Sequence, residues 1–132
     1  MSALQDPFTL TLPARATSLA VVRHVLGGAQ QAWSIDPDLL DDVRLAVAEA
    51  CIGVVMRADA DGARGLLEVH GGLDHGHVVV AVRDTGTGRA SPTDGSADHL
   101  ELTLIDALTE HVSFGLAPGG GREIRMTFPP SA

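Results

Sequence analysis

Residues 42–58 read DVRLAVAEACIGVVMRA, and this stretch decides how the rest of the chain is organised. Apolar side chains recur in it at steps of three and four residues, at Val43, Val47, Ala50 and Val54. That spacing is typical of an amphipathic helix with one side packed against a hydrophobic core. The stretch therefore predicts a long helix that supplies much of the core.

One carboxylate interrupts this mostly apolar helix. Glu49 lies four residues before Gly53, so both residues fall on the same side of the helix. A glutamate in this setting is either a rim residue in water or a catalytic or metal-organising carboxylate over a pocket. Motifs elsewhere in the chain have to decide between these two interpretations.

The sequence on either side of this helix predicts five strands and two further helices. Alternating residues or short apolar runs predict strands over residues 8–12, 66–70, 78–83, 112–116 and 124–128. Helical spacing predicts helices over residues 17–33 and 100–111, and Asp36-Pro37 should start the central helix. Because the strands come in adjacent pairs, we expect an α+β two-layer sandwich. Its sheet should be mixed but mainly antiparallel, with about five strands and three helices on one face.

Short sequence signals refine this outline. Pro13 ends the first strand and favours an edge position in the sheet. Gly27-Gly28 would either weaken the first helix or let another helix approach closely. Residues 71–76 should join the second and third strands. Residues 84–98, DTGTGRASPTDGSAD, contain almost no large apolar side chain, so we expect a mobile loop there.

The composition excludes several classes of function. The net charge of −8 disfavours a nucleic acid partner, because binding a phosphate backbone needs a basic surface. The chain contains no Lys and no Asn, so it has no P-loop lysine and no asparagine ligand. Its single cysteine, Cys51, cannot form an internal disulfide or a cysteine-based zinc site, and is expected to be a small buried hydrophobe. The length of 132 residues predicts one domain over residues 1–132, with its core at about 8–129.

The N-terminal residues lack the basic start and the apolar run of a signal peptide, and no apolar run reaches membrane-spanning length. We therefore expect a cytoplasmic protein. His75-Gly76-His77 beside Asp74 has the residue types of a metal cluster, but a predicted turn makes solvated residues the better interpretation.

A second motif follows the most apolar predicted strand. Residues 84–88 read DTGTG, with Asp84 just past the strand and Gly86 and Gly88 after it. A carboxylate there can accept a hydrogen bond from an exocyclic amine such as that of adenine, and the glycines let the backbone pass close to a ligand. Taken alone, the motif also fits an ordinary turn.

The two motifs together resemble the Bergerat-fold, or histidine kinase-like, ATPases. A helix that carries Glu49-Ala50 is followed by a strand ending in DTGTG, a polar loop and another helix. Within that group the chain is most similar to the anti-sigma-factor serine kinases of bacterial stress and sporulation switches. The resemblance extends over roughly residues 10–129.

The resemblance implies roles for individual residues. Glu49 would be the general base that acts on a serine of a partner protein. Asp84 would bind adenine, with Gly86 and Gly88 shaping the loop beside the nucleotide. ATP and Mg²⁺ would be the cofactors.

Three departures from the family pattern bear on those roles. The family places a magnesium-binding Asn four residues after the glutamate, where this chain has Gly53, so we expect no metal ligand from this chain. Residues 99–102 read HLEL where the family has a glycine-rich phosphate element before its last helix. Gly121 is followed by Arg122, where the family has a Gly-Thr pair. Together they indicate that the outline of the nucleotide pocket is kept, while the residues that bind magnesium and the triphosphate are impaired. Arg57, Arg83 and Arg89 are either compensating phosphate contacts or surface arginines.

Three functional hypotheses remain open from the sequence. The first is an anti-sigma-factor-like regulator that binds a sigma factor and a competing anti-anti-sigma (STAS-type) protein, with weak or lost serine kinase activity. The second is a non-catalytic interaction module that keeps the fold without nucleotide binding. The third is an unrelated small α/β enzyme that uses Glu49, although no second motif supports it. By resemblance, the chain would form a homodimer.

Overall fold

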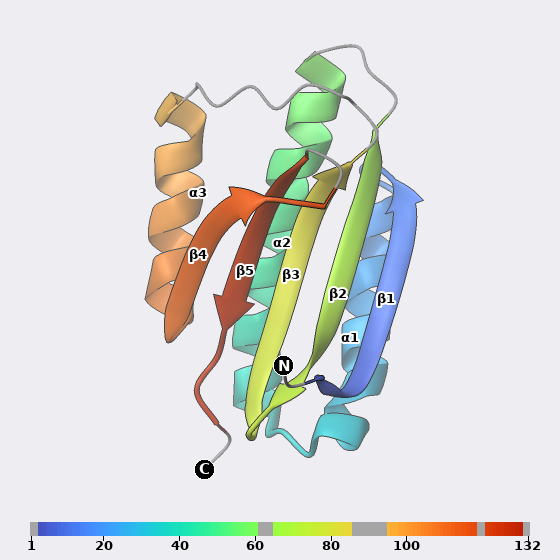
Figure 1. The fold of residues 1–132 in the computed structure, drawn as a ribbon, viewed down its shortest axis with the longest axis vertical. Coiled ribbons are helices and arrows are strands. Elements are labelled where there is room, and N and C mark those ends of the chain that lie inside the picture. The colour runs from blue at the N-terminus through green and yellow to red at the C-terminus, as the bar shows by residue number, and fades with distance from the viewer. Residues whose placement is uncertain (1–2, 61–64, 86–94, 119–120, 131–132) are drawn as a thin grey trace.

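The protein folds into two layers, with a sheet on one side and helices on the other (Figure 1). The computed structural model describes residues 3–60, 65–85, 95–118 and 121–130, and for residues 59–60 and 95–101 the backbone alone. None of the described helices is both long enough and apolar enough to cross a membrane.

Five strands form one sheet in the described part of the chain, in the order β1-β2-β3-β5-β4. The strands are β1 (Gln5–Pro13), β2 (Leu66–Asp74), β3 (His77–Thr85), β4 (His111–Leu116) and β5 (Arg122–Thr127). The helices are α1 (Ser18–Trp33), α2 (Pro37–Ala60) and α3 (Gly95–Leu108). The predicted α+β two-layer sandwich is confirmed, and β1 takes the predicted edge position. The described strands pair antiparallel throughout, so the sheet is not mixed.

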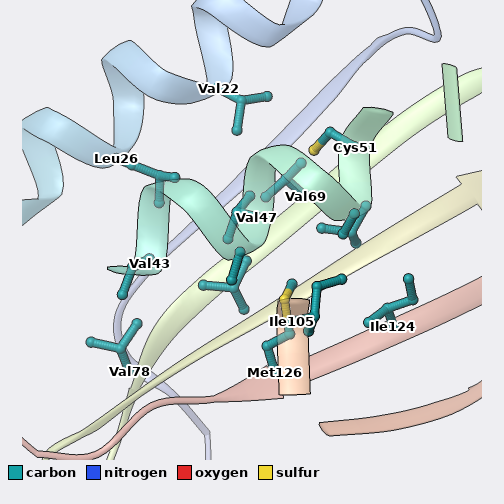
Figure 2. Packing of buried hydrophobic residues seen from close by; sticks show 14 of the residues in the cluster. Val22, Leu26, Val43, Val47, Cys51, Val69, Val78, Ile105, Ile124 and Met126 are labelled. Carbon is teal, nitrogen blue, oxygen red and sulfur yellow. The ribbon is translucent and has the colours of Figure 1, made fainter. Parts of the chain in front are cut away.

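The hydrophobic core lies between the sheet and the helices, with α2 at its centre (Figure 2). The side of α2 that faces the sheet is buried, from Val43 and Val47 to Val54, as the helical spacing predicts. Cys51 is also fully buried, in agreement with its predicted role as a small hydrophobe. The neighbouring elements complete the core with Val22 and Leu26 of α1, Ile105 of α3, Leu67, Val69, Val78 and Val80 of the β2–β3 hairpin, and Ile124 and Met126 of β5.

The β2–β3 hairpin is tighter than the sequence indicates. Asp74 pairs with His77, so His75 and Gly76 alone make the turn, with φ values of 50° and 85°. Two positive φ values are typical of a type I′ turn, which matches the twist of the flanking strands. The prediction that residues 71–76 join the two strands was therefore wrong for residues 71–74, which belong to β2. A Cβ on Gly71 would lie 2.5 Å from Cε2 of Phe8, so the glycine makes room for that ring.

The predicted polar loop over residues 84–98 is also shorter than expected at both ends. Asp84 and Thr85 continue β3, where they pair with Leu67 and Leu66 of β2. Helix α3 begins at Gly95 instead of residue 100. The remainder, residues 86–94, lies outside the described residues.

The Arg44 side chain of α2 packs against Gly27 of α1. A Cβ on Gly27 would overlap Nη2 of Arg44, which donates a hydrogen bond of 3.3 Å to the carbonyl oxygen of Arg23. By contrast, nothing lies within 4 Å of a Cβ on Gly28. Of the two glycines, only Gly27 therefore makes room for α2, and it does so for the Arg44 side chain.

This difference predicts gains of different size for two neighbouring substitutions. Gly28→Ala should raise the free energy of unfolding by about 0.5–1 kcal/mol, because alanine is the better helix former and its methyl group meets nothing. Gly27→Ala should raise the free energy of unfolding by less, because the Arg44 guanidinium has to move. Urea unfolding of both variants measures the difference. Equal gains would show that Arg44 does not restrict this position.

Candidate functional site

Three residues follow one another along one side of α2 at steps of four. Glu49 is half-buried, Gly53 is buried, and Arg57 has a side chain that is 26% exposed. A helix places residues four apart on one side, and the stripe turns slowly around the axis because 3.6 residues make a turn. The stripe therefore runs from the rim at Glu49 towards the sheet at Arg57.

Asp84 meets this stripe from the sheet. Alternate β3 side chains point into the helical layer, so Asp84 follows Val78, Val80 and Val82 on the buried face. Its side chain is 10% exposed. A carboxylate so removed from water needs a compensating charge or hydrogen bond.

Arg57 supplies that charge. Its Nε lies 3.9 Å from Oδ2 of Asp84, which joins α2 to the end of β3. The sequence raised Arg57 as a candidate phosphate contact, but the structure brings it to the carboxylate that was predicted to bind adenine. The only sequence signal for this pair is that Arg57 lies two turns after Glu49 on the same side of the helix.

The backbone of Asp84 is held by a second close contact. A Cβ on Gly121 would overlap the carbonyl oxygen of Asp84, so only glycine allows the chain to pass there. The next residue, Arg122, pairs with Asp84 in the β3–β5 ladder. Gly121 therefore belongs to the candidate site through its backbone.

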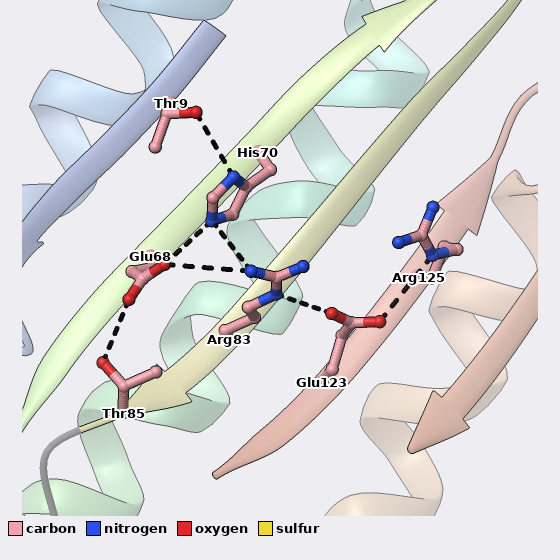
Figure 3. A network of polar contacts seen from close by, with 7 residues as sticks. All are labelled: Thr9, Glu68, His70, Arg83, Thr85, Glu123 and Arg125. Atoms are coloured by element: carbon pink, nitrogen blue, oxygen red, sulfur yellow. Dashed lines mark hydrogen bonds and ion pairs between the residues drawn. The ribbon is translucent and has the colours of Figure 1, made fainter. Parts of the chain in front are cut away.

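Arg83 lies on the opposite face of the sheet, away from Asp84. Figure 3 shows it in a polar network on the face that no helix covers. Its Nε donates to Oε2 of Glu123 at 2.6 Å, and its Nη1 lies 4.0 Å from Oε1 of Glu68. The network continues through His70, whose Nε2 lies 2.8 Å from Glu68 Oε1, to Thr9 of the edge strand.

This network holds neighbouring strands together and leaves no role for Arg83 in a nucleotide pocket. Of the two interpretations of Arg83, the structure supports an arginine on the open face of the sheet and not a phosphate contact. Gly86, Gly88 and Arg89 lie outside the described residues, and their predicted roles stay predictions. The stretch HLEL, residues 99–102, lies within α3 rather than before it.

The described residues fit adenine better than they fit magnesium. Gly53 has no side chain with which to bind a cation, and the described residues contain no cluster of three or more His, Cys, Asp or Glu that could hold a metal. Asp84 is a buried carboxylate at the end of a strand, which suits an exocyclic amine, and Arg57 lies 3.9 Å from one of its two oxygens.

The proteins found to be similar in sequence are histidine kinase-like ATPase domains and serine-protein kinases. The histidine kinase-like ATPase domain family matches residues 12–128. Serine-protein kinase RsbW of Bacillus velezensis is 30% identical over 86 residues, which are 65% of this chain and 54% of that kinase. Serine-protein kinase RsbW of Halalkalibacterium halodurans is 32% identical over 120 residues, 81% of this chain and 74% of that kinase. The chain thus spans about half the length of the first of these relatives.

Solved structures show the same fold. The RsbU and RsbW domains of a Mycobacterium tuberculosis protein superpose with a TM-score of 0.74 at 22% identity, covering 97% of this chain and 33% of that one. The SiaB–SiaC complex of Pseudomonas aeruginosa gives a TM-score of 0.65 at 15% identity, covering 92% and 88%. At these identities the likeness concerns the fold alone.

Proposed function

The chain belongs to the histidine kinase-like ATPase domain family, and on that premise we propose that it is an anti-sigma-factor-like switch protein. It binds a sigma factor, and a STAS-type anti-anti-sigma protein competes for the same chain. The observation that carries this proposal is the 32% identity to an RsbW serine-protein kinase over 81% of the chain. The proposal also includes a cytoplasmic location, a role in a bacterial stress response and a homodimeric state.

The proposed switch has a nucleotide site with little catalytic power. Glu49 is the residue for general-base action on a partner serine, and Asp84 is the residue for adenine, with Gly86 and Gly88 beside it. Magnesium normally bridges phosphate oxygens and neutralises developing charge, and Gly53 provides no side-chain atom to hold it. We therefore propose that partner binding is the main activity and that phosphate transfer is slow or lost.

Phosphate transfer can be tested directly. The chain is mixed with ATP, Mg²⁺ and the purified STAS-type protein, and phosphoserine is followed by mass spectrometry. We expect transfer that is slow or undetectable, and any transfer should fall by a further factor of about 100 in Glu49→Gln, because general-base catalysis contributes about 10²–10⁴. Fast transfer would contradict the proposal that the nucleotide site has little catalytic power. Transfer that is unchanged in Glu49→Gln would remove this residue from the mechanism. Failure of the chain to bind any sigma factor or STAS-type protein would remove the switch function itself.

The second candidate function is an interaction module without nucleotide binding. Two features favour it, the missing side chain at Gly53 and the engagement of Asp84 by Arg57. Calorimetric titration with ATP separates the two candidates. Micromolar binding that is lost in Asp84→Ala supports the switch with a nucleotide site. No binding supports the module, and magnesium-dependent binding gained in Gly53→Asn would show that the remainder of the pocket is intact.

A further inference from the structure

The two edges of the sheet differ in how they are protected against a further strand. On β1, Pro7 and Pro13 lack a backbone N–H, and a register shift lies between Gln5 and Phe8. Both features oppose pairing with another strand. On β4, the register with β5 is regular over residues 111–116, and the strand contains no Pro, Asp, Glu, Lys or Arg. Five of its six residues are exposed, so the neighbouring helix α3 does not cover this edge (Figure 1).

The hydrogen bonds around β5 show which backbone groups of β4 point outward. Ala117 donates its backbone N–H to the carbonyl oxygen of Gly121 at 2.6 Å, which continues the β4–β5 register. On the other side of β5, Phe128 donates its backbone N–H to the carbonyl oxygen of Val78. Because alternate residues of a strand bond to opposite neighbours, the odd-numbered residues of β4 bond to β5. The residues whose N–H and C=O groups point to the outer edge are Val112, Phe114 and Leu116.

The same residues present apolar side chains. Phe114 pairs with Ile124, whose buried side chain faces the helices, so the side chains of Val112, Phe114 and Leu116 lie on that side of the sheet. Val112 packs against the core, whereas Phe114 is 53% exposed and Leu116 is 73% exposed. A strand added to this edge would pair with the outward backbone groups and cover both side chains with its own residues at every second position.

The charge of the chain decides which kind of strand fits. The chain carries −8, so a second copy brings a like charge to an edge that has no charged side chain to offset it. The last turn of α3, which leads into β4, contains no basic residue. A segment with a net positive charge is attracted to such a protein.

From these observations we propose that β4 binds an extended, positively charged segment of a partner protein. The segment adds to the sheet as a strand antiparallel to β4, with apolar residues at alternate positions. Strand addition of this kind obtains affinity from main-chain hydrogen bonds and specificity from alternate side chains. The inference goes beyond the proposed switch function and does not depend on it, because it uses neither the nucleotide site nor a sigma factor.

The probe for this surface is the capped peptide Lys-Val-Thr-Val-Thr-Val-Lys. Its binding is followed by the shifts of the chain's backbone amide signals in NMR spectra, with hydrogen exchange measured alongside. We expect the shifts to centre on β4, and the amides of Val112, Phe114 and Leu116 to exchange at least about tenfold more slowly in the complex. These amides should exchange rapidly in the free chain, because they point to the open edge.

Two modified peptides test the strand pairing on the unaltered chain. An N-methyl group on the central valine removes an N–H that bonds to β4, and should weaken binding at least about tenfold. An N-methyl group on the threonine next to it removes an N–H that points away from β4, and should change binding by less than about twofold. Replacing both lysines of the peptide by glutamate should weaken binding, and the loss should shrink in high salt.

Variants of the chain test the edge itself. Leu116→Pro removes an outward N–H and leaves the bonds between β4 and β5 in place, so it should weaken peptide binding at least about fivefold more than Leu116→Ala. Phe114→Thr should weaken binding by about fivefold or more, whereas Leu66→Thr, which replaces an exposed leucine of β2, should stay within about twofold of the parent. Thermal unfolding checks that each variant is folded, and the N-methylated peptides carry the test if Leu116→Pro is not.

Several results would overturn the inference while the switch function stands. These are no shifts at about 1 mM peptide, shifts along β1 instead of β4, equal binding of the two N-methylated peptides, and equal binding of the lysine and glutamate peptides. Sedimentation of the chain alone tests the other occupant. If Phe114→Thr converts a dimer into monomers, a second copy occupies β4 and the inference is wrong. Failure to bind a sigma factor or a STAS-type protein would remove the switch function and leave this inference untouched.

Discussion

Gly121→Ala is expected to lower the free energy of unfolding by about 2–3 kcal/mol, although it adds a single methyl group. The added Cβ would overlap the carbonyl oxygen of Asp84. Both groups belong to the main chain or are attached directly to it, so no side-chain rotation relieves the overlap. The end of the β3–β5 ladder, where Asp84 pairs with Arg122, then has to separate. Urea unfolding monitored by circular dichroism measures the loss.

Gly115→Ala provides the matched control for this substitution. Gly115 lies on β4 opposite Glu123 of β5, and nothing lies within 4 Å of a Cβ added to it. We expect its free energy of unfolding to change by less than about 0.5 kcal/mol. An equal change in both variants would mean that the cost arises from replacing any glycine beside β5 and not from the contact between Gly121 and Asp84.

The fold could be predicted from sequence because its signals are local and repeated. The apolar spacing around Val43 and Val47 predicts the central helix, and adjacent strand pairs predict an antiparallel sheet. The element boundaries were less certain, since the hairpin turn contains only His75 and Gly76. Gly71 looked like a turn residue because the sequence does not show that Phe8, far along the chain, packs against it.

The candidate site could be predicted in part. Glu49 and Asp84 were singled out because their motifs resemble those of a family. Arg57 was not identified as the partner of Asp84, because the contact between Arg57 and β3 depends on how α2 lies across the sheet. The alternation of side chains along β3 places Arg83 on the face opposite to Asp84, whereas no sequence pattern shows that Arg57 reaches Asp84. Sequence patterns report the face of an element more reliably than they report a contact between two elements.

Helix α2 carries a different task on each of its sides. Val47 and Val54 face the core, Gly53 and Arg57 follow the side towards Asp84, and Leu45 and Met56 are exposed. A ligand at the Asp84 side and a partner that contacts the exposed side would therefore both act on one helix. If a nucleotide changes the affinity for the partner, thermodynamic linkage requires the partner to change the affinity for the nucleotide by the same factor.

Arg57→Gln is expected to tighten the binding of adenine nucleotides by about three- to tenfold, which is at most about 1.4 kcal/mol. In the parent chain, the Arg57 guanidinium lies 3.9 Å from Oδ2 of Asp84 and competes with an adenine amine for the carboxylate. Glutamine keeps a long polar side chain but removes the positive charge. The expected gain is modest because the Arg57 side chain is 26% exposed and water screens the pair.

Titrations with AMP and with ATP show whether the gain comes from the adenine end. Release of Asp84 should improve both nucleotides by a similar factor, because they share the base. The double variant Arg57→Gln/Asp84→Ala should lose the gain, since the benefit of removing the guanidinium depends on the carboxylate that it covers. A loss of ATP affinity in Arg57→Gln, with AMP unaffected, would instead place the guanidinium on the phosphates. Arg57 would then help nucleotide binding rather than oppose it, and the Asp84 contact would be its resting position only.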